Sequence, residues 1–374
     1  MKEGDSERKK VAIFLPSLMG GGAEKVMVIL ANSLIERGIS VDLVLVNATG
    51  PYLKNVDPKV NVVNLDSARQ ITSLIPLINY IKSQKPKIML SVLTSANIIA
   101  IFARIFSRTS FKLVISERAV TSLAVKDNKL LIAKVFPFLM RLAYPFADAI
   151  VAVANGVKRD LIQNYKVPGN KIKVIYNPVV TDELISLSQE EFYHQWFQDN
   201  NVPVIVAVGR LTSQKNFKLL INAFAKVSEI LDSRLVILGE GEMRGELEAL
   251  VDDLNIGSKV ELPGFAGNPY VWLKNASLFV LSSDYEGLPG TLIQAMACGV
   301  PVVSTNCPSG PDEILENGKW GRLVPTGNLS ALETAIIQTL QDKKHPDVKF
   351  RAKFFSIKNA TDAYIEVLGL NVNN

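Results

Sequence analysis

The chain has 374 residues and a mass of 41.0 kDa, which is more than one ordinary domain of roughly 100–200 residues needs. Hydrophobic residues make up 48% and charged residues 21%, so disorder, collagen and a solvating acidic chain are excluded as descriptions of the whole. The two cysteines, Cys298 and Cys307, are too few for a disulfide framework, and no C-x-x-C pair is present to bind zinc. We therefore expect a two-domain protein in a reducing, cytoplasmic setting.

Charge is divided unevenly along the chain. Residues 1–177 carry 25 Lys+Arg and 12 Asp+Glu, a net charge of +13, whereas residues 178–374 have a net charge of −8. A basic half of this kind favours an anionic partner. The basic residues are not interleaved with aromatic ones, and no helix-turn-helix or zinc-finger spacing occurs, so nucleic acid is not expected. An anionic membrane surface or a phosphorylated acceptor fits better.

No segment predicts secretion or a membrane span. The apolar run "VAIFLPSL" after the charged N-terminus has eight residues and no cleavage site, which is short for a signal peptide. The uncharged run at residues 88–103 has 16 residues, four of them polar, whereas a spanning helix needs about 20 apolar residues. A strand followed by a buried helix explains this run better.

Short apolar runs alternate with helical patterns through the first half of the chain. The predicted strands of this half are 10–16, 41–47, 60–65, 87–93, 112–116, 147–153 and 171–176. Helical patterns such as 23–37 and 74–84 lie between them. Near-continuous apolar strands separated by helices indicate a parallel sheet that is covered on both faces.

The pattern repeats after an interruption. Residues 178–200 are acidic and irregular and are interpreted as an interdomain linker, after which the predicted strands are 203–208, 234–238, 259–262, 277–282, 300–304 and 321–324. The prediction is an α/β protein with two Rossmann-like domains, residues 1–177 and 201–354. We expect a cleft between them, lined by the carboxyl ends of both sets of strands, and a C-terminal helix at about 355–370 that packs back on the first domain.

Glycines follow the first predicted strand directly. Gly20, Gly21 and Gly22 let the backbone approach a ligand, and the free amides of a helix opening at Ala23 favour an anion. The alternative is a tight strand-to-helix turn. The spacing is not G-x-G-x-x-G, and Asp42 falls inside the second strand rather than after it, so a nicotinamide cofactor is not expected.

The second half opens with two cations on the loop after its first strand. Arg210 and Lys215 are five residues apart and precede a helix, so they can hold a diphosphate, arginine as a fork and lysine as a point charge. The alternative is a solvated basic loop. Gly241 and Phe265 lie on two further strand-end loops that could present groups to a base, although ordinary turn chemistry explains these loops as well.

The most informative stretch is "LFVLSSDYEGLPGTLIQAMACGVPVVSTNCPSGPDEIL". Glu286 lies in a turn after a strand, and a helix follows whose first amides, those of Gly290, Thr291 and Leu292, would face an incoming phosphate. Gln294 follows Glu286 by eight residues, so both side chains can face a ligand over the helix start.

These motifs resemble those of the retaining nucleotide-sugar glycosyltransferases of family 4, which have the GT-B architecture of two facing Rossmann-like domains. The similarity covers nearly the whole chain, through "GGGAEK", "GRLTSQKN", "GEGEMRGELEAL" and "YEGLPGTLIQAMACGVPVVSTNCPSGPDEIL" in this order. The last motif is highly specific. Its sequence resembles the corresponding motif of enzymes that add hexoses or hexosamines to polyprenyl-diphosphate-linked glycans or surface polysaccharides.

The resemblance implies a role for each matching residue. Arg210 and Lys215 match the pair that neutralises the donor diphosphate as the glycosidic bond breaks, and Glu286 matches the first Glu of the family's E-x₇-E motif, which contacts sugar hydroxyls. Gln294 replaces the second Glu and keeps a hydrogen bond to ribose without its charge. Catalytic roles thus fall to Arg210, Lys215 and Glu286, and the donor-binding set is Gly21, Gly22, Arg210, Lys215, Gly241, Phe265, Glu286, Gly290, Thr291, Leu292 and Gln294.

The acceptor side departs from the family pattern. Several relatives carry a histidine near the end of the fifth strand, whereas Glu117 and Arg118 stand there in this chain and become the acceptor-side candidates. A strand-end ion pair is the alternative. No D-x-D occurs, so neither an essential divalent metal nor any other cofactor is expected.

A basic, apolar stretch in the first half is a candidate for contact with lipid. In residues 126–146 the cations cluster on one side of a helical projection, and apolar side chains fill most of the rest. The alternative is a packed helix with a solvated face. The candidate membrane-surface residues are Arg104, Arg108, Lys129, Lys134 and Arg141.

Together these patterns predict a peripheral enzyme on the cytoplasmic face of the cell membrane. It would move a hexose or N-acetylhexosamine from a UDP-sugar to a polyprenyl-diphosphate-linked glycan, with retention at the anomeric carbon. A nucleotide-sugar epimerase on the same fold and a non-catalytic nucleotide-sugar-binding protein are the alternatives.

Overall fold

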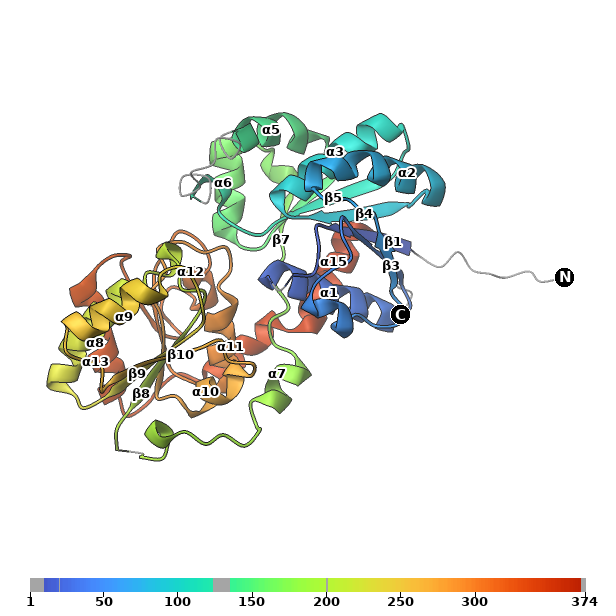
Figure 1. The fold of residues 1–374 in the computed structure, drawn as a ribbon. Helices are drawn as coiled ribbons and strands as arrows, with labels where there is room; N and C mark the ends of the chain where they lie inside the picture. Colours follow the sequence, from blue (N-terminus) through green and yellow to red (C-terminus); the bar gives the residue numbers. More distant parts are fainter. Residues whose placement is uncertain (1–9, 20, 124–134, 200, 371–374) are drawn as a thin grey trace. The chain divides into compact units, whose positions relative to one another are not determined.

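The computed structural model describes residues 10–19, 21–123, 135–199 and 201–370 (Figure 1). The chain forms two compact units. The first unit comprises Met1–Pro178 together with Ile357–Asn374, and the second comprises Val179–Ser356. In the described residues no helix is both long enough and apolar enough to cross a membrane.

The first unit is built on a sheet of seven parallel strands in the order β3-β2-β1-β4-β5-β6-β7. Except for the two edge strands β3 and β7, these strands are buried almost throughout, which explains why they read as continuous apolar runs in the sequence. Their bounds are β1 Lys10–Leu15, β2 Ser40–Leu45, β3 Asn61–Asn64, β4 Ile88–Val92, β5 Lys112–Glu117, β6 Ala149–Ala152 and β7 Ile172–Val174.

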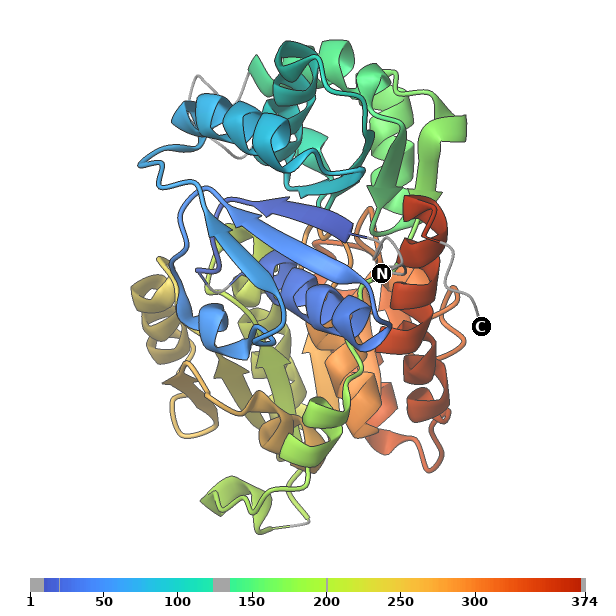
Figure 2. The same ribbon diagram turned by 90° about the vertical axis from the view of Figure 1, so that its right-hand side faces the viewer.

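Helices cover both faces of this sheet. Helices α1 and α15 share one hydrophobic core with one face, while α2 and α3 lie against the other (Figures 1 and 2). The α-helices of the first unit are α1 Gly22–Glu36, α2 Leu74–Gln84, α3 Thr94–Ser107, α5 Phe136–Ala143, α6 Asn155–Tyr165 and α15 Ile357–Leu368. Its 3₁₀ helices are η1 Pro51–Asn55, η2 Gln70–Ser73, η4 Tyr144–Phe146 and η5 Gly169–Lys171.

Helix α15 comes from the C-terminal end of the chain and belongs to the first unit. It packs on α1, where Arg37 donates to Asp362 at 2.8 Å and Thr361 donates to Ser33 at 3.0 Å. The chain therefore returns to its first unit after completing the second.

The second unit has a six-stranded parallel sheet in the order β10-β9-β8-β11-β12-β13. Its strands are β8 Val204–Val208, β9 Arg234–Leu238, β10 Val260–Gly264, β11 Leu278–Leu281, β12 Val302–Thr305 and β13 Arg322–Val324. Its α-helices are α7 Asp182–Leu187, α8 Phe217–Ile230, α9 Arg244–Asp253, α10 Pro269–Asn275, α11 Gly290–Cys298, α12 Pro311–Ile314, α13 Leu329–Gln341 and α14 Val348–Ala352. Its 3₁₀ helices are η6 Gln195–Phe197, η7 Ser213–Lys215 and η8 Lys353–Phe355.

Both sheets confirm the predicted α/β class with two Rossmann-like folds. In each sheet the strand order reverses once, between β1 and β4 in the first unit and between β8 and β11 in the second. Ligands of such sheets bind outside the carboxyl ends of the strands at this reversal. The two reversals therefore mark where the functional residues of each unit should gather.

The segment interpreted from sequence as a linker, residues 178–200, is more ordered than expected. All but its first residue belong to the second unit, and it contains α7, capped by the Thr181 side chain. Farther along, the Phe192 ring lies 4.9 Å from the Trp272 ring of α10, and His194 approaches Glu261 at 3.0 Å. Aromatic and polar side-chain contacts thus attach this acidic stretch to α10 and β10 of the second unit.

Candidate active site

The loops after β8 and β11 meet at the strand reversal of the second unit. Gln214 donates through Nε2 to the carbonyl of Tyr285 at 2.8 Å and accepts from the amide of Asp284 at 2.9 Å. The Ser282 hydroxyl donates to the carbonyl of Lys215 at 2.8 Å. These bonds hold the loop that carries Lys215 against the loop that carries Glu286.

Lys215 and Glu286 form an ion pair at the centre of this arrangement. Lys215 Nζ lies 2.5 Å from Glu286 Oε1, which also accepts the Ser283 hydroxyl at 2.7 Å. The two side chains are 17% and 9% exposed, so the pair is largely removed from water. An anionic ligand at this position would compete with the carboxylate for the ammonium group.

Helix α11 directs its N-terminus into the same region. Pro289 caps it, and Gly290, Thr291 and Leu292 are its first three residues, whose amides have no acceptor inside the helix. The hydroxyl Oγ1 of Thr291 is buried and has no hydrogen-bond partner, the one such side-chain atom among the described residues of the second unit. A buried hydroxyl without a partner next to free amides indicates a place for a bound anion.

The turn before α11 is held by tight packing. Gly310 has φ +99°, and a Cβ built on it would lie 2.5 Å from Cδ of Pro289. The neighbouring Ser309 hydroxyl donates to the carbonyl of Gly287 at 2.7 Å. The motif "PSGP" therefore fixes the shape of the loop that carries Glu286.

The remaining donor-side candidates of the second unit have different surroundings. Arg210 is exposed, and the Phe265 ring is 82% exposed, so both are open to a ligand. Gln294 is half-buried and is the fifth residue of α11, one turn beyond the free amides. A Cβ at Gly241 would lie 2.3 Å from the carbonyl oxygen of Leu211, so this glycine is required for contact between two loops.

The glycine pair of the first unit starts helix α1. Gly21 is the N-cap and Gly22 the first helical residue, one residue earlier than expected from the sequence. A Cβ on Gly21 would meet the Glu24 side chain at 2.2 Å, whereas a Cβ on Gly22 would meet nothing within 4 Å. Both glycines lie in the first unit, and Gly22 leaves space at the start of the helix.

The acceptor-side candidates have separate environments, and the alternative of an ion pair between them is wrong. Glu117 is fully buried and accepts hydrogen bonds from four side chains, those of Thr94, Asn97, Thr121 and Tyr144. Burial raises the pKa of Glu117, and these hydrogen bonds oppose the shift. Arg118 instead donates from Nη1 to the Tyr364 hydroxyl at 3.2 Å.

The membrane-surface candidates are only partly available. Arg104 is bound to Asp148 at 2.6 Å, whereas Arg108 and Arg141 are exposed. Lys129 and Lys134 lie outside the described residues. Helix α3 contacts α5, and exposed apolar side chains lie on these helices and on η4. We call this set, Ile105, Phe106, Phe138, Leu142 and Phe146, the apolar patch.

Cysteine and metal chemistry find little support in the described residues. Both cysteines are free and buried, and burial raises the pKa of Cys298 to about 11 and that of Cys307 to about 12. These thiols fit the core interpretation of Cys298. Within the described ranges no group of three or more His, Cys, Asp and Glu could hold a metal ion. The absence of an essential metal stays a prediction.

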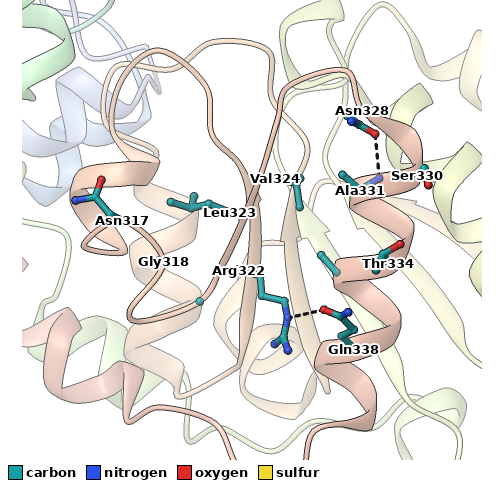
Figure 3. Close-up of a pocket in the computed structure, with 12 residues that line it drawn as sticks. Asn317, Gly318, Arg322, Leu323, Val324, Asn328, Ser330, Ala331, Thr334 and Gln338 are labelled. Carbon is teal, nitrogen blue, oxygen red and sulfur yellow. Dashed lines mark hydrogen bonds between the residues drawn. The ribbon is translucent and has the colours of Figure 1, made fainter.

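A groove of about 670 Å³ lies apart from these residues, along the edge strand β13 and helix α13 (Figure 3). The Arg322 side chain in it is held by Gln338, Thr339 and Asp342. The residues that line the groove include no carboxylate, so it lacks the acid, base or free cation that catalysis would need.

Sequence reasoning missed several residues of these sites. It named the amide of Thr291 but not its hydroxyl, and it did not assign Ser283, which hydrogen-bonds to Glu286, to the site. It also missed Asn97 and Tyr144, which hold Glu117. The two serines that directly follow β11 were a usable signal for Ser283, since a polar pair after an apolar strand lies where ligands bind.

Comparison with known proteins agrees with this geometry. Residues 20–183 match the model described as Glycosyltransferase Family 4, and residues 188–354 match the model described as Glycosyl transferases group 1. A relative from Campylobacter jejuni, "N-acetylgalactosamine-N,N'-diacetylbacillosaminyl-diphospho-undecaprenol 4-alpha-N-acetylgalactosaminyltransferase", is 32% identical over 96% of this chain and all of its own. The chain belongs to the family 4 glycosyltransferases, which have the GT-B architecture.

A second relative and a solved structure are also similar to this chain over nearly its whole length. A second Campylobacter jejuni protein, "GalNAc-alpha-(1->4)-GalNAc-alpha-(1->3)-diNAcBac-PP-undecaprenol alpha-1,4-N-acetyl-D-galactosaminyltransferase", is 26% identical over 96% of this chain and 98% of its own. Among solved structures, Anabaena HepE in complex with UDP has 18% identity and a TM-score of 0.78, covering 96% of this chain and 99% of that one. This structural likeness supports the fold.

Proposed function

We propose that this glycosyltransferase moves a hexose or N-acetylhexosamine from a UDP-sugar to a polyprenyl-diphosphate-linked glycan, with retention at the anomeric carbon. The observation that carries the proposal is the Lys215–Glu286 ion pair beside the free amides of α11 and the unpartnered hydroxyl of Thr291. The similar Anabaena structure binds UDP, and both Campylobacter relatives are named for an undecaprenyl-diphosphate-linked acceptor.

The second unit supplies positive groups where the leaving group gains charge. As the bond between the sugar and the diphosphate breaks, negative charge grows on the diphosphate oxygens. Lys215, Arg210 and the N-terminal amides of α11 would neutralise it, and preorganised donors of this kind are worth several kcal/mol, about 10²–10³-fold in rate for one donor. Once Lys215 turns to the diphosphate, Glu286 is free to accept from sugar hydroxyls.

The two histidines of the chain do not offer a general base. His194 approaches Glu261 in the acidic segment, and His345 lies in the loop before α14. We propose that the leaving diphosphate oxygen itself accepts the proton of the attacking acceptor hydroxyl, on the face that the leaving group vacates. Same-face attack gives retention, and the cationic groups above replace a divalent metal.

We also propose that the protein works at the cytoplasmic face of the cell membrane. The first unit carries the apolar patch, and two exposed arginines lie beside it, Arg108 at the C-cap of α3 and Arg141 on α5. Apolar side chains that enter the interface and cations that meet anionic headgroups are the two attractions that hold peripheral proteins on lipid.

A transfer assay tests the proposal. The protein is incubated with UDP-glucose, UDP-galactose and their N-acetylated forms, each with undecaprenyl-diphosphate-linked glycans as acceptors, with and without EDTA. We expect one UDP-sugar to yield an extended lipid-linked glycan in both conditions, with an α-linkage from an α-configured donor by NMR. A β-linkage would contradict retention, and no product with any pair would contradict the proposed function.

A further inference from the structure

The carboxyl ends of β4 and β5 show features that the proposed donor site does not use. Leu93, directly after β4, has φ +82°, a conformation that non-glycine residues rarely adopt and that costs about 1–3 kcal/mol. Its amide donates to the carbonyl of Ser116 at 3.3 Å, which joins the ends of the two strands. This strained position lies at the strand reversal of the first sheet, where strain and ligand binding often coincide.

Arg118 follows β5 at this edge and has an incomplete set of partners. Its Nη1 donates to the Tyr364 hydroxyl at 3.2 Å and lies 3.5 Å from the Ser116 hydroxyl. Its Nε and Nη2 are buried and have no hydrogen-bond partner in the described structure. Leaving charged donors buried without an acceptor is costly, so these two nitrogens need an explanation.

The neighbouring carboxylate of Glu117 does not accept hydrogen bonds from these two nitrogens. Both oxygens of Glu117 accept from other side chains: Oε1 from Asn97 and Tyr144, Oε2 from Thr94 and Thr121. Thr94 and Asn97 lie on α3, Thr121 lies four residues after Glu117, and Tyr144 lies on η4. Glu117 is therefore fastened on several sides, and it fixes the backbone from which the Arg118 side chain extends.

The two unpartnered nitrogens have a defined chemistry. Nε and Nη2 lie on one edge of the planar guanidinium, and their N–H groups point in parallel, the arrangement that binds two oxygens of a phosphate or carboxylate. With Nη1 held by Tyr364 and Ser116, that edge is the part of Arg118 left for a ligand.

We propose that this edge of Arg118 binds two oxygens of one phosphate group of the diphosphate-linked acceptor, and that Glu117 is a positioning residue for it. The proposal deepens the proposed function and rests on it for the identity of the acceptor. The donor offers the same phosphate chemistry, but its diphosphate already has Lys215, Arg210 and α11 in the second unit. Kinetics with each substrate varied separately distinguishes the two sources.

The test compares Arg118→Ala and Arg118→Lys with Arg37→Ala, which removes another arginine of the first unit, one that pairs with Asp362. We expect Arg118→Ala to raise the KM for the lipid-linked acceptor about 10–100-fold, the loss of a charge-assisted bidentate contact, while the KM for the UDP-sugar stays within about 2-fold. Arg118→Lys keeps the charge without the fork and should recover only part of the loss. A raised donor KM with an unchanged acceptor KM would overturn the proposal, as would wild-type kinetics in Arg118→Ala.

A second arm does not depend on turnover. Inorganic diphosphate is titrated calorimetrically into the Lys215→Met protein, whose donor site is weakened, and into Lys215→Met combined with Arg118→Ala. We expect binding to the first that is weakened at least about 10-fold in the second. Equal binding by both would overturn the assignment of Arg118. If diphosphate binding depends on Arg118 and no sugar is transferred, the proposed function fails while the phosphate site stands.

Discussion

The Lys215–Glu286 pair allows a quantitative test by a double-mutant cycle. Lys215→Met removes the ammonium group and keeps most of the stem, and Glu286→Gln removes the charge and keeps the shape. Breaking a fully buried pair by deleting one partner costs about 3–5 kcal/mol, because the other charge stays buried and unpaired. The side chains of Lys215 and Glu286 are 17% and 9% exposed and so are not fully buried. We therefore expect Lys215→Met to lower the free energy of unfolding by about 2–4 kcal/mol.

The expected losses of stability for the other two variants of the cycle follow from the same contacts. In Glu286→Gln the amide oxygen still accepts from Lys215 or from Ser283, so the cost should be smaller, about 1–2 kcal/mol. The double variant has no buried charge left over and should lose less than the sum of the single variants. The expected coupling energy is about 1–2 kcal/mol.

Tryptophan fluorescence during urea unfolding measures these free energies in the second unit, which contains the Lys215–Glu286 pair. The chain has three tryptophans, Trp196, Trp272 and Trp320, and all of them lie in the second unit. Lys218→Met is the matched control, because Lys218 is 46% exposed and pairs with Glu246 on the surface, where such pairs are worth about 0–1 kcal/mol. A coupling energy below about 0.5 kcal/mol, or equal losses in Lys215→Met and Lys218→Met, would refute the reasoning.

Three further outcomes are expected. Burial raises the pKa of Glu117 above its ordinary value of 4.5, so above pH 4.5 the native state keeps a proton that the unfolded chain has lost. The free energy of unfolding of wild type, relative to that of Glu117→Gln, should therefore fall as pH rises above 4.5. A difference between the two proteins that stays constant with pH in urea unfolding would contradict this. Gln294→Glu replaces a neutral hydrogen bond to ribose by a charge-assisted one and should tighten UDP binding about 5-fold by calorimetry, whereas unchanged or weaker binding would oppose the proposed contact. Phe138→Ser should lower binding to phosphatidylglycerol vesicles about 10-fold in sedimentation, while the equally apolar and exposed Ile230→Ser in the second unit should not; equal effects would remove the assignment of the apolar patch.

The sequence was sufficient to predict the strands of both sheets. Each predicted strand begins and ends within two residues of the observed one, because parallel strands covered on both faces require continuous apolar residues. The donor-side residues Lys215 and Glu286 could be anticipated for a related reason. Polar and charged residues directly after buried strands lie at the ligand-binding edge of a parallel sheet.

The environments of other residues depend on contacts that no local pattern encodes. The four donors around Glu117 come from positions between 94 and 144, so its burial could not be read from the residues beside it. The acidic segment after residue 178 is held by aromatic contact between Phe192 and Trp272, about 80 residues away in the chain, and such a contact leaves no periodic signal. The interdomain cleft stays a prediction.

Calorimetric titration of nucleoside diphosphates tests the central claim most directly, that the second unit holds the diphosphate of a UDP-sugar with Lys215 and the start of α11. UDP, GDP, ADP and CDP are titrated in EDTA into wild type, Lys215→Met and the control Lys218→Met. The account predicts that UDP binds tightest, that Lys218→Met equals wild type, and that Lys215→Met binds UDP at least about 10-fold more weakly. No binding of UDP to wild type, or equal affinity in Lys215→Met, would contradict it.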